Sequence, residues 1–239
     1  MVTKTSVLLA LSVSLGLLLP IPAGAEEWKY DLELYLLGAG IDGTAGVGPA
    51  AAEIELSFSD VFDNLEFGAM GLFRARKGRW AALGDVMFVG LGSATEVAEV
   101  DVDQLILEGV GVCMVTDRLG LLFGGRYVDL ESKIEFRGPL RLSARGGESW
   151  LDPLVGLGVE SPMSEKWTFY GRVDAGGFGV GSDLSYQLKL NFGYRPSDRF
   201  SLRFGYRLLD IDYEDGTGAD RFLYDVQTRG PNAGLVLHF

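Results

Sequence analysis

Hydrophobic and polar residues alternate along much of this chain with a period of two. The clearest case is 184–194, where every second residue from Leu184 to Tyr194 is aliphatic or aromatic and the residues between are small or polar. Segments 200–207 and 28–34 repeat the pattern. Successive side chains of a β-strand point to opposite faces, so this period predicts strands with one apolar face.

Short and long connections alternate strictly between these segments. The short ones are Arg76–Arg79, Thr116–Arg118, Ser161–Lys166 and Arg195–Arg199, each with the Gly, Pro, Ser or Asp that a tight turn needs. The longer polar or Gly-rich stretches lie near 43–65, 92–101, 135–148, 177–182 and 214–221. Four turns and five loops join ten strands, and bacterial transmembrane barrels alternate short periplasmic turns with longer outer loops.

The sequence therefore predicts an all-β fold, a closed antiparallel up-and-down transmembrane β-barrel of about ten strands, with eight or twelve as alternatives. Closure is expected because a lipid bilayer tolerates no open sheet edge. The predicted strands are roughly 28–42, 66–76, 79–91, 102–116, 119–134, 149–160, 166–177, 183–195, 199–213 and 221–239.

Two segments leave the strand count open. Ile54, Leu56 and Phe58 alternate, as do Ile134 and Phe136. Either segment could be a further strand, or the tall rim of a hairpin above the membrane. From Phe58 to Leu65 the apolar spacing is helical, with Ser57 and Asp60 placed as a capping pair. This predicts a short loop helix, either packed on the rim or folded into the barrel mouth as a plug.

The first 25 residues have the organisation of an export signal. Lys4 supplies the positive charge, Val7–Leu19 is an apolar run too short to span a membrane, and Ala23–Ala25 is a small-residue cleavage site after Pro20 and Pro22. An N-terminal anchor helix is the alternative. We expect a signal peptide at 1–25 and a barrel domain at 26–239.

Aromatic residues gather at the predicted strand ends, as they do where a barrel meets the membrane interface. The predicted periplasmic belt is Trp28, Trp80, Trp167, Tyr194, Phe200 and Phe239, and the predicted outer belt is Phe88, Tyr127, Phe178, Tyr213 and Phe222. The chain ends on an aromatic residue after an alternating strand, an ending typical of bacterial outer-membrane barrels. The predicted C-terminal assembly signal is Leu235, Leu237 and Phe239.

Three blocks carry a family resemblance: Leu56–Leu65, Ala75–Trp80 and Gly176–Asp183. With them, most of the mature chain resembles a family of uncharacterised outer-membrane β-barrel proteins of Gram-negative bacteria, and more broadly small OmpA-type and porin-like barrels. The resemblance implies export through the Sec pathway to the cell outer membrane and no particular activity. The expected partners are outer-membrane lipid and lipopolysaccharide, with the barrel assembly machinery during biogenesis.

Composition narrows the class further. Gly accounts for 34 of 239 residues, about twice its usual share. Loss of the leader would change the net charge from −12 to −13, which argues against nucleic acid as a partner. The single cysteine, Cys113, excludes an internal disulfide. The uniformly apolar exterior face predicts a monomer.

Charged residues of both signs fall on the predicted lumen face. Two interpretations stand: a network of ion pairs filling the lumen of a structural or surface-interaction protein, or the lining of a narrow porin-like channel for small polar solutes or ions. The signs are nearly balanced, so no ring of one sign marks a selective pore. The predicted lumen-facing charges are Lys29, Asp31, Glu33, Glu66, Arg74, Asp85, Glu108, Arg126, Asp152, Arg172, Asp174, Lys189, Arg203 and Arg207.

Candidate chemistry is sparse. The only histidine, His238, falls at the periplasmic end. Barrel enzymes generally use a histidine near the outer rim, so we expect no Ser or Asp to form a rim triad with His238. Acidic clusters near 96–103 and 210–220 offer oxygen ligands for Ca²⁺ or Mg²⁺ but lack an EF-hand spacing, so solvated loops are expected. The sequence predicts no enzyme, no catalytic residue, no metal site and no cofactor.

Overall fold

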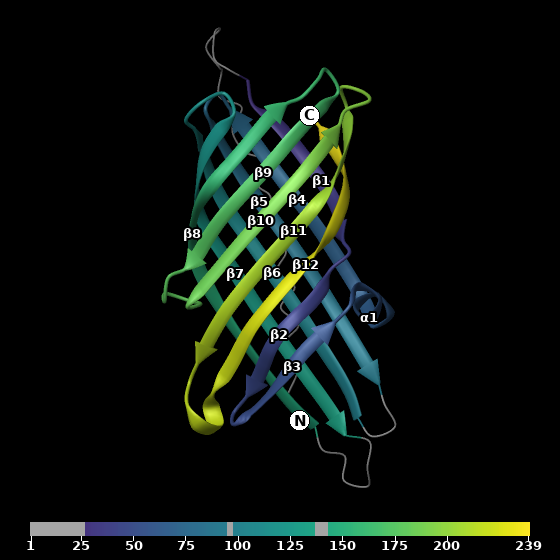
Figure 1. Cartoon of the computed structure of the whole chain (residues 1–239), viewed down its shortest axis with the longest axis vertical. Coiled ribbons are helices and arrows are strands. Elements are labelled where there is room, and N and C mark those ends of the chain that lie inside the picture. The colour runs from purple at the N-terminus through teal and green to yellow at the C-terminus, as the bar shows by residue number, and fades with distance from the viewer. Residues whose placement is uncertain (1–26, 95–97, 137–142) are drawn as a thin grey trace, which may run out of the picture.

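The computed structural model describes residues 27–94, 98–136 and 143–239. The predicted signal peptide therefore lies outside the described residues. Ten strands form a closed antiparallel ring, in which each strand pairs with the next along the chain and β12 returns to β1 (Figure 1). The ring strands are β1 (Lys29–Leu37), β4 (Leu65–Lys77), β5 (Trp80–Ala94), β6 (Ala98–Met114), β7 (Leu119–Phe136), β8 (Ser143–Pro162), β9 (Trp167–Gly177), β10 (Leu184–Tyr194), β11 (Phe200–Asp215) and β12 (Phe222–His238). The prediction of a ten-stranded barrel is confirmed.

The first ring strand, β1, starts at the end of the barrel that carries the short turns, and the chain ends there at Phe239 (Figure 1). Bacterial barrels place short turns in the periplasm. We therefore name this the periplasmic end and the opposite one the outer end.

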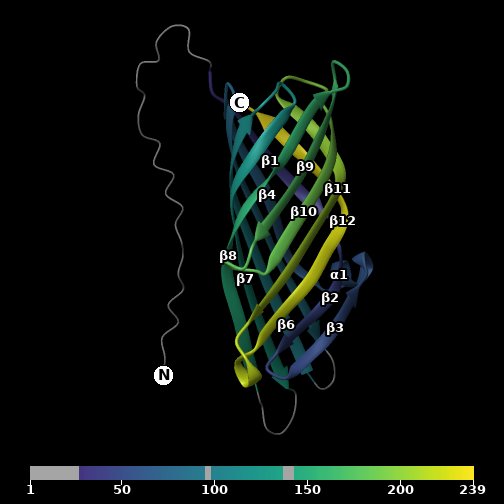
Figure 2. The ribbon, with the colours of Figure 1, turned by 60° about the vertical axis from the view of Figure 1, so that its left-hand side comes forward.

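Two further strands, β2 (Gly40–Val47) and β3 (Ala50–Leu56), stand outside the ring at its outer end (Figures 1 and 2). β2 prolongs β1 in the same register along β12, since Leu37 pairs with Asn232 and Gly40 with Arg229. The segment around Ile54 is thus a strand, but the alternative of a twelve-stranded ring is wrong because β3 pairs only with β2.

The helix α1 (Phe58–Asp63) lies against the outside of the wall beside β2 (Figures 1 and 2). The predicted capping box is present: Asp60 N–H donates to Ser57 Oγ at 3.3 Å, and Ser57 N–H donates to Asp60 at 2.8 Å. The hydrogen bonds from Ser57 lower the pKa of Asp60. Phe58 packs close to Gly38 and Pro231 on the outer surface, so the helix is not a plug.

Several strands are far longer than the 9–11 residues that cross a bilayer. β6, β7 and β8 have 17, 18 and 20 residues. Much of what the sequence indicated as long loops near 92–101 and 135–148 is therefore strand that continues beyond the membrane.

The side-chain pattern inverts along these long strands. Outward positions near the periplasmic end are aromatic or aliphatic, and most of the predicted periplasmic belt is exposed there. About ten residues further along β6, β7 and β11, outward positions become acidic, at Asp103, Asp129 and Asp210. Beyond that level the inward positions are apolar instead. A barrel in lipid is apolar outside, and a barrel in water is apolar inside.

This inversion corrects part of the predicted outer belt. Phe178 is exposed, and Phe88 and Tyr127 face outward. Tyr213 is buried inside the barrel, and Phe222 packs against the same interior cluster. Alternation identifies two faces, but it does not tell which face turns inward once the surroundings change from lipid to water.

Candidate functional site

A buried ion-pair layer crosses the middle of the lumen. Arg126 on β7 is its centre and has no exposed surface. Its guanidinium donates to Glu108 at 2.9 Å, to Asp174 at 2.6 Å and to the hydroxyl of Ser185 at 3.0 Å. These partners come from β6, β9 and β10, so a single side chain ties four strands together across the barrel.

Two further side chains complete this centre. Arg172 donates to both Glu108, at 2.9 Å, and Asp174, at 2.7 Å. Gln187 donates to both carboxylates at 3.1 Å and is itself fully buried. Charges removed from water are tolerated only when they are paired and hydrogen-bonded, and this centre meets that condition for both acids.

A second group continues the layer towards β1. Lys189 contacts Asp85 at 2.5 Å, and Tyr35 donates its hydroxyl proton to the other oxygen of Asp85 at 2.7 Å. Arg207 donates to the Tyr35 hydroxyl at 2.9 Å and lies 3.7 Å from Glu108. The two groups therefore form one network across the lumen.

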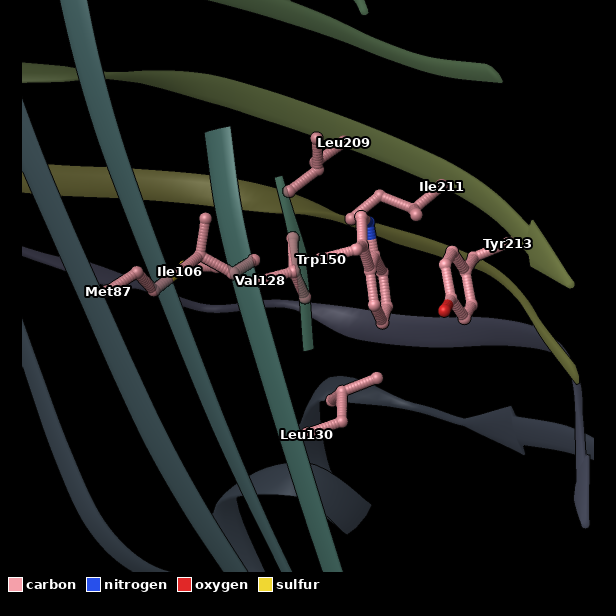
Figure 3. Packing of buried hydrophobic residues seen from close by; sticks show 8 residues of the cluster. All are labelled: Met87, Ile106, Val128, Leu130, Trp150, Leu209, Ile211 and Tyr213. Atoms are coloured by element: carbon pink, nitrogen blue, oxygen red, sulfur yellow. The ribbon is translucent and has the colours of Figure 1, made fainter. Parts of the chain in front are cut away.

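Apolar side chains fill the lumen on the outer side of this layer (Figure 3). The buried members of this outer apolar layer are Met87, Ile106, Val128, Leu130, Trp150, Leu209, Ile211 and Tyr213. Trp150 and Tyr213 stack at 3.9 Å between ring centroids. From the outer end, water and ions would have to displace this packed cluster to reach the charged layer.

The β9–β10 connection is short, and it tucks against β8. Ser182 donates its backbone N–H and its hydroxyl proton to Asp152, both at 2.7 Å, and both residues are fully buried. Phe178 takes the left-handed φ of 53° that this tight turn requires. The two hydrogen bonds to Asp152 fix the connection against β8.

A cavity of about 150 Å³ lies on the periplasmic side of the ion-pair layer. Its wall is amphipathic, with apolar side chains from β4 to β7 and bases from β4, β9, β10 and β11. The apolar residues are Leu72, Ala81, Leu83, Val112, Met114 and Leu122, and the bases are Arg74, Arg76, Arg172, Lys189 and Arg203. Glu160 is the one acid in this wall.

The periplasmic mouth holds a chain of three hydrogen-bonded side chains. His238 Nδ1 lies 2.7 Å from Asp31 Oδ1, and His238 Nε2 lies 2.6 Å from Ser201 Oγ. Arg74 contacts the other oxygen of Asp31 at 2.6 Å. Asp31 and Ser201 thus flank His238 at the periplasmic end, a grouping that was not predicted, since the expectation of no triad with His238 concerned the outer rim. Closure of β12 on β1 places Asp31 directly opposite His238.

The structure brings together most of the predicted lumen-facing charges. Asp152 bonds Ser182, and eleven residues make ion pairs within the barrel: Asp31, Glu33, Arg74, Asp85, Glu108, Arg126, Arg172, Asp174, Lys189, Arg203 and Arg207. Lys29 is exposed at the periplasmic end. Glu66 is also exposed, because the β4–β5 register shifts at this residue and turns its side chain towards Gly92 on the outer face.

The residues of the predicted C-terminal assembly signal lie outside this network. Leu235, Leu237 and Phe239 are exposed on the outer face, as expected for the C-terminal strand.

No group of three or more His, Cys, Asp or Glu suited to holding a metal occurs among residues 27–94, 98–136 and 143–239. Those same residues include no helix long and apolar enough to cross a membrane.

Comparison with known proteins places the fold. No family model matches the chain, and no curated protein matches it by sequence. Among solved structures, the outer membrane protease OmpT from Escherichia coli is similar with a TM-score of 0.52 and 11% identity, over 90% of this chain and 97% of that one. The chain has the fold of an outer-membrane β-barrel.

Two other structures match less well. The attachment invasion locus protein Ail of Yersinia pestis has a TM-score of 0.41 and 11% identity, over 90% of this chain and 99% of that one. The Neisserial surface protein A has a TM-score of 0.35 and 11% identity, over 90% of this chain and 99% of that one. At these identities the likeness concerns the fold and not an activity.

Proposed function

We propose that this protein is an integral outer-membrane barrel with a closed lumen and a structural or surface-interaction role. The observation that carries the proposal is the complete burial of Arg126 between Glu108 and Asp174 in mid-lumen. A conducting path needs water at every level of the barrel. Here the central side chains contact one another rather than solvent.

The order of the layers supports the same function. From the outer end inwards, the lumen contains the outer apolar layer and then the ion-pair layer, and only below them the amphipathic cavity. An apolar constriction resists passage of ions because it dewets, and an ion-pair network of both signs offers no selective ring of one sign. The cavity is thus a blind pocket open towards the periplasm.

The outer surface supports a role in contact with lipid and the cell exterior. A groove of about 480 Å³ lies between α1, the β2–β3 hairpin and the wall, and includes Tyr206, Arg229 and Pro231. Phe58 and Phe62 of α1 are 53% and 63% exposed at the height where the apolar band ends. An amphipathic helix in this place is suited to the headgroup region of the outer leaflet.

Planar-bilayer recording tests the proposal. The mature chain, Glu26 to Phe239, is refolded in detergent, shown by circular dichroism to be β-rich, and added to a lipid bilayer. We expect no steady conductance steps, while a porin added afterwards to the same bilayer shows that the assay responds. Reproducible steps from the folded chain would overturn the closed-lumen proposal in favour of a narrow passive channel.

A further inference from the structure

The hydrogen-bonded group at the periplasmic mouth has the arrangement of a nucleophile, a base and an orienting acid. Its members come from three adjacent strands at the seam of the ring: Ser201 on β11, His238 on β12 and Asp31 on β1. All three face the lumen. The two hydrogen bonds use different ring nitrogens of His238, at 2.7 Å to Asp31 and 2.6 Å to Ser201.

The direction of these hydrogen bonds follows from the chemistry of the acceptors. An ionised carboxylate accepts and cannot donate, so Asp31 selects the form of His238 that carries its proton on Nδ1. A neutral ring then leaves Nε2 as an acceptor for the hydroxyl proton of Ser201. This is the tautomer that a serine nucleophile needs from its base.

The three side chains of this group are mostly buried but keep some exposure to solvent. Ser201 is 8% exposed, and the side chains of His238 and Asp31 are 17% and 13% exposed. Arg74 contacts Asp31 and also lines the amphipathic cavity, so the group and the cavity adjoin. Arg203, two residues beyond Ser201 on the same inward face, has a buried Nε–H with no hydrogen-bond partner among the described residues and also lines the cavity.

We propose that Ser201, His238 and Asp31 form a hydrolytic site at the periplasmic mouth, acting on short acyl esters. The substrate class follows from the cavity. Its apolar wall suits a short acyl chain. The bases in the same wall are already paired with carboxylates, so the cavity sets no charge requirement on the substrate. Ser201 and His238 are the catalytic residues, and Asp31 is a positioning residue.

The reaction balances with water as the second reactant. Ser201 Oγ bonds to the ester carbonyl carbon while its proton passes to His238 Nε2, and the carbonyl electron pair moves onto oxygen. Collapse of this adduct breaks the bond to the alcohol oxygen, which takes the proton from Nε2. Water then attacks the acyl-serine with the same base and releases the acid. The unpartnered N–H of Arg203 is the candidate donor to the negatively charged oxygen.

The tautomer can be measured directly because the chain contains a single histidine. Nitrogen-15 labelled histidine in the refolded barrel, at about pH 8.5 and well above the ordinary histidine pKa of ~6.5, gives one pair of ring signals. We expect protonated Nδ1 and unprotonated Nε2 in the wild type, and loss of this preference in Asp31→Asn. Protonated Nε2 in the wild type would overturn the proposal.

Covalent labelling tests the nucleophile. A fluorophosphonate probe added to the full mature chain in detergent should label Ser201, located by peptide mass spectrometry. We expect no label in Ser201→Ala and a rate at least ~100-fold lower in His238→Asn. Ser197 lies in the exposed turn four residues earlier, so Ser197→Ala should label as the wild type does.

Two outcomes would reject the site. One is the absence of label from the folded wild type, and the other is equal labelling of Ser197 and Ser201. If His238→Asn does not assemble, the wild-type label position and the wild-type tautomer together decide the question. A conducting lumen would overturn the closed-barrel proposal but leave these two results unaffected.

Discussion

Trp150 on β8 and Tyr213 on β11 stack face to face, with ring centroids 3.9 Å apart and planes 9° from parallel. Two strands, β9 and β10, separate β8 from β11 in the ring. The stack forms because the β9–β10 hairpin ends early, and the longer neighbours meet above it. The two rings thus close a gap in the wall that backbone pairing leaves open. Figure 3 shows both residues within the buried apolar cluster.

Truncation of this stack should destabilise the outer part of the barrel. Trp150→Ala should lower the free energy of unfolding by about 3–5 kcal/mol, the usual cost of removing a large buried aromatic side chain. Trp150→Phe should recover much of the loss. Urea titration in lipid vesicles, followed by circular dichroism, measures the change. Leu151→Ala on the exposed face is the control, and an equal loss there would contradict the buried role of Trp150.

Removal of Arg126 should be costly because it leaves two acids buried without their cation. Arg126→Met should lower the free energy of unfolding by about 3–5 kcal/mol. The same urea titration measures it. Arg195 pairs with Asp198 in an exposed turn, so Arg195→Met should change stability by less than ~1 kcal/mol. Similar effects of the two substitutions would mean that the lumen is hydrated around Arg126.

The destabilisation caused by a charge on the outward face should depend on its distance from the membrane midplane. Leu188 faces outward in the middle of β10. Leu188→Arg should cost about 2–4 kcal/mol in bilayers. Glu131 faces outward beyond the apolar band, and Glu131→Arg should change stability by no more than ~0.5 kcal/mol. Unaffected folding of Leu188→Arg in vesicles would place this surface away from lipid.

Phe239 should contribute to assembly through its backbone as well as its ring. Its N–H donates to Tyr30 at 2.9 Å, and its carbonyl accepts from Tyr30 at 3.2 Å, across the seam of the ring. Deletion of Phe239 should reduce assembled barrel more than Phe239→Ala, which keeps both hydrogen bonds. Heat-modifiable gel migration of outer-membrane fractions measures the folded amount. Normal assembly of the truncated chain would remove the support for an assembly signal.

The helix α1 should sit at the lipid interface. Phe62 is 63% exposed, and Phe62→Trp should be quenched by lipids brominated near the headgroup more strongly than by lipids brominated at the chain end. The emission must be measured against a background variant, because the chain has four other tryptophans. Quenching by an aqueous quencher alone would place α1 in water.

The ring count was predictable because it rests on local signals. Alternation in segments such as 184–194 and the polar turns between them set ten strands without knowledge of their neighbours. The capping pair of Ser57 and Asp60 was equally local, and α1 begins where it was predicted. The predicted strand 28–42 is interrupted, and its two parts belong to β1 and β2. This interruption was not predicted, because it depends on strand pairing: β1 pairs with β4, whereas β2 leaves the ring and pairs with β3.

The site was less predictable, since its contacts join distant parts of the chain. Arg126 and Asp174 are 48 residues apart, and Asp31 and His238 are 207 apart. Their meeting depends on register around the whole ring and on the closing strand pair. One available signal was overlooked: if the last strand of a barrel pairs with the first, His238 must lie near residues at the start of β1.

The change from an apolar to an acidic exterior also fixes the barrel relative to the thickness of its membrane. About ten residues, at ~3.3 Å each and tilted as barrel strands are, span roughly 25 Å of hydrocarbon. A shift of the barrel towards the periplasm would bring Asp103, Asp129 and Asp210 into the acyl chains. A shift in the opposite direction would move Trp80 and Trp167 of the periplasmic belt out of the membrane interface. The protein is therefore matched to a thin bilayer, and a thicker one would have to deform around it.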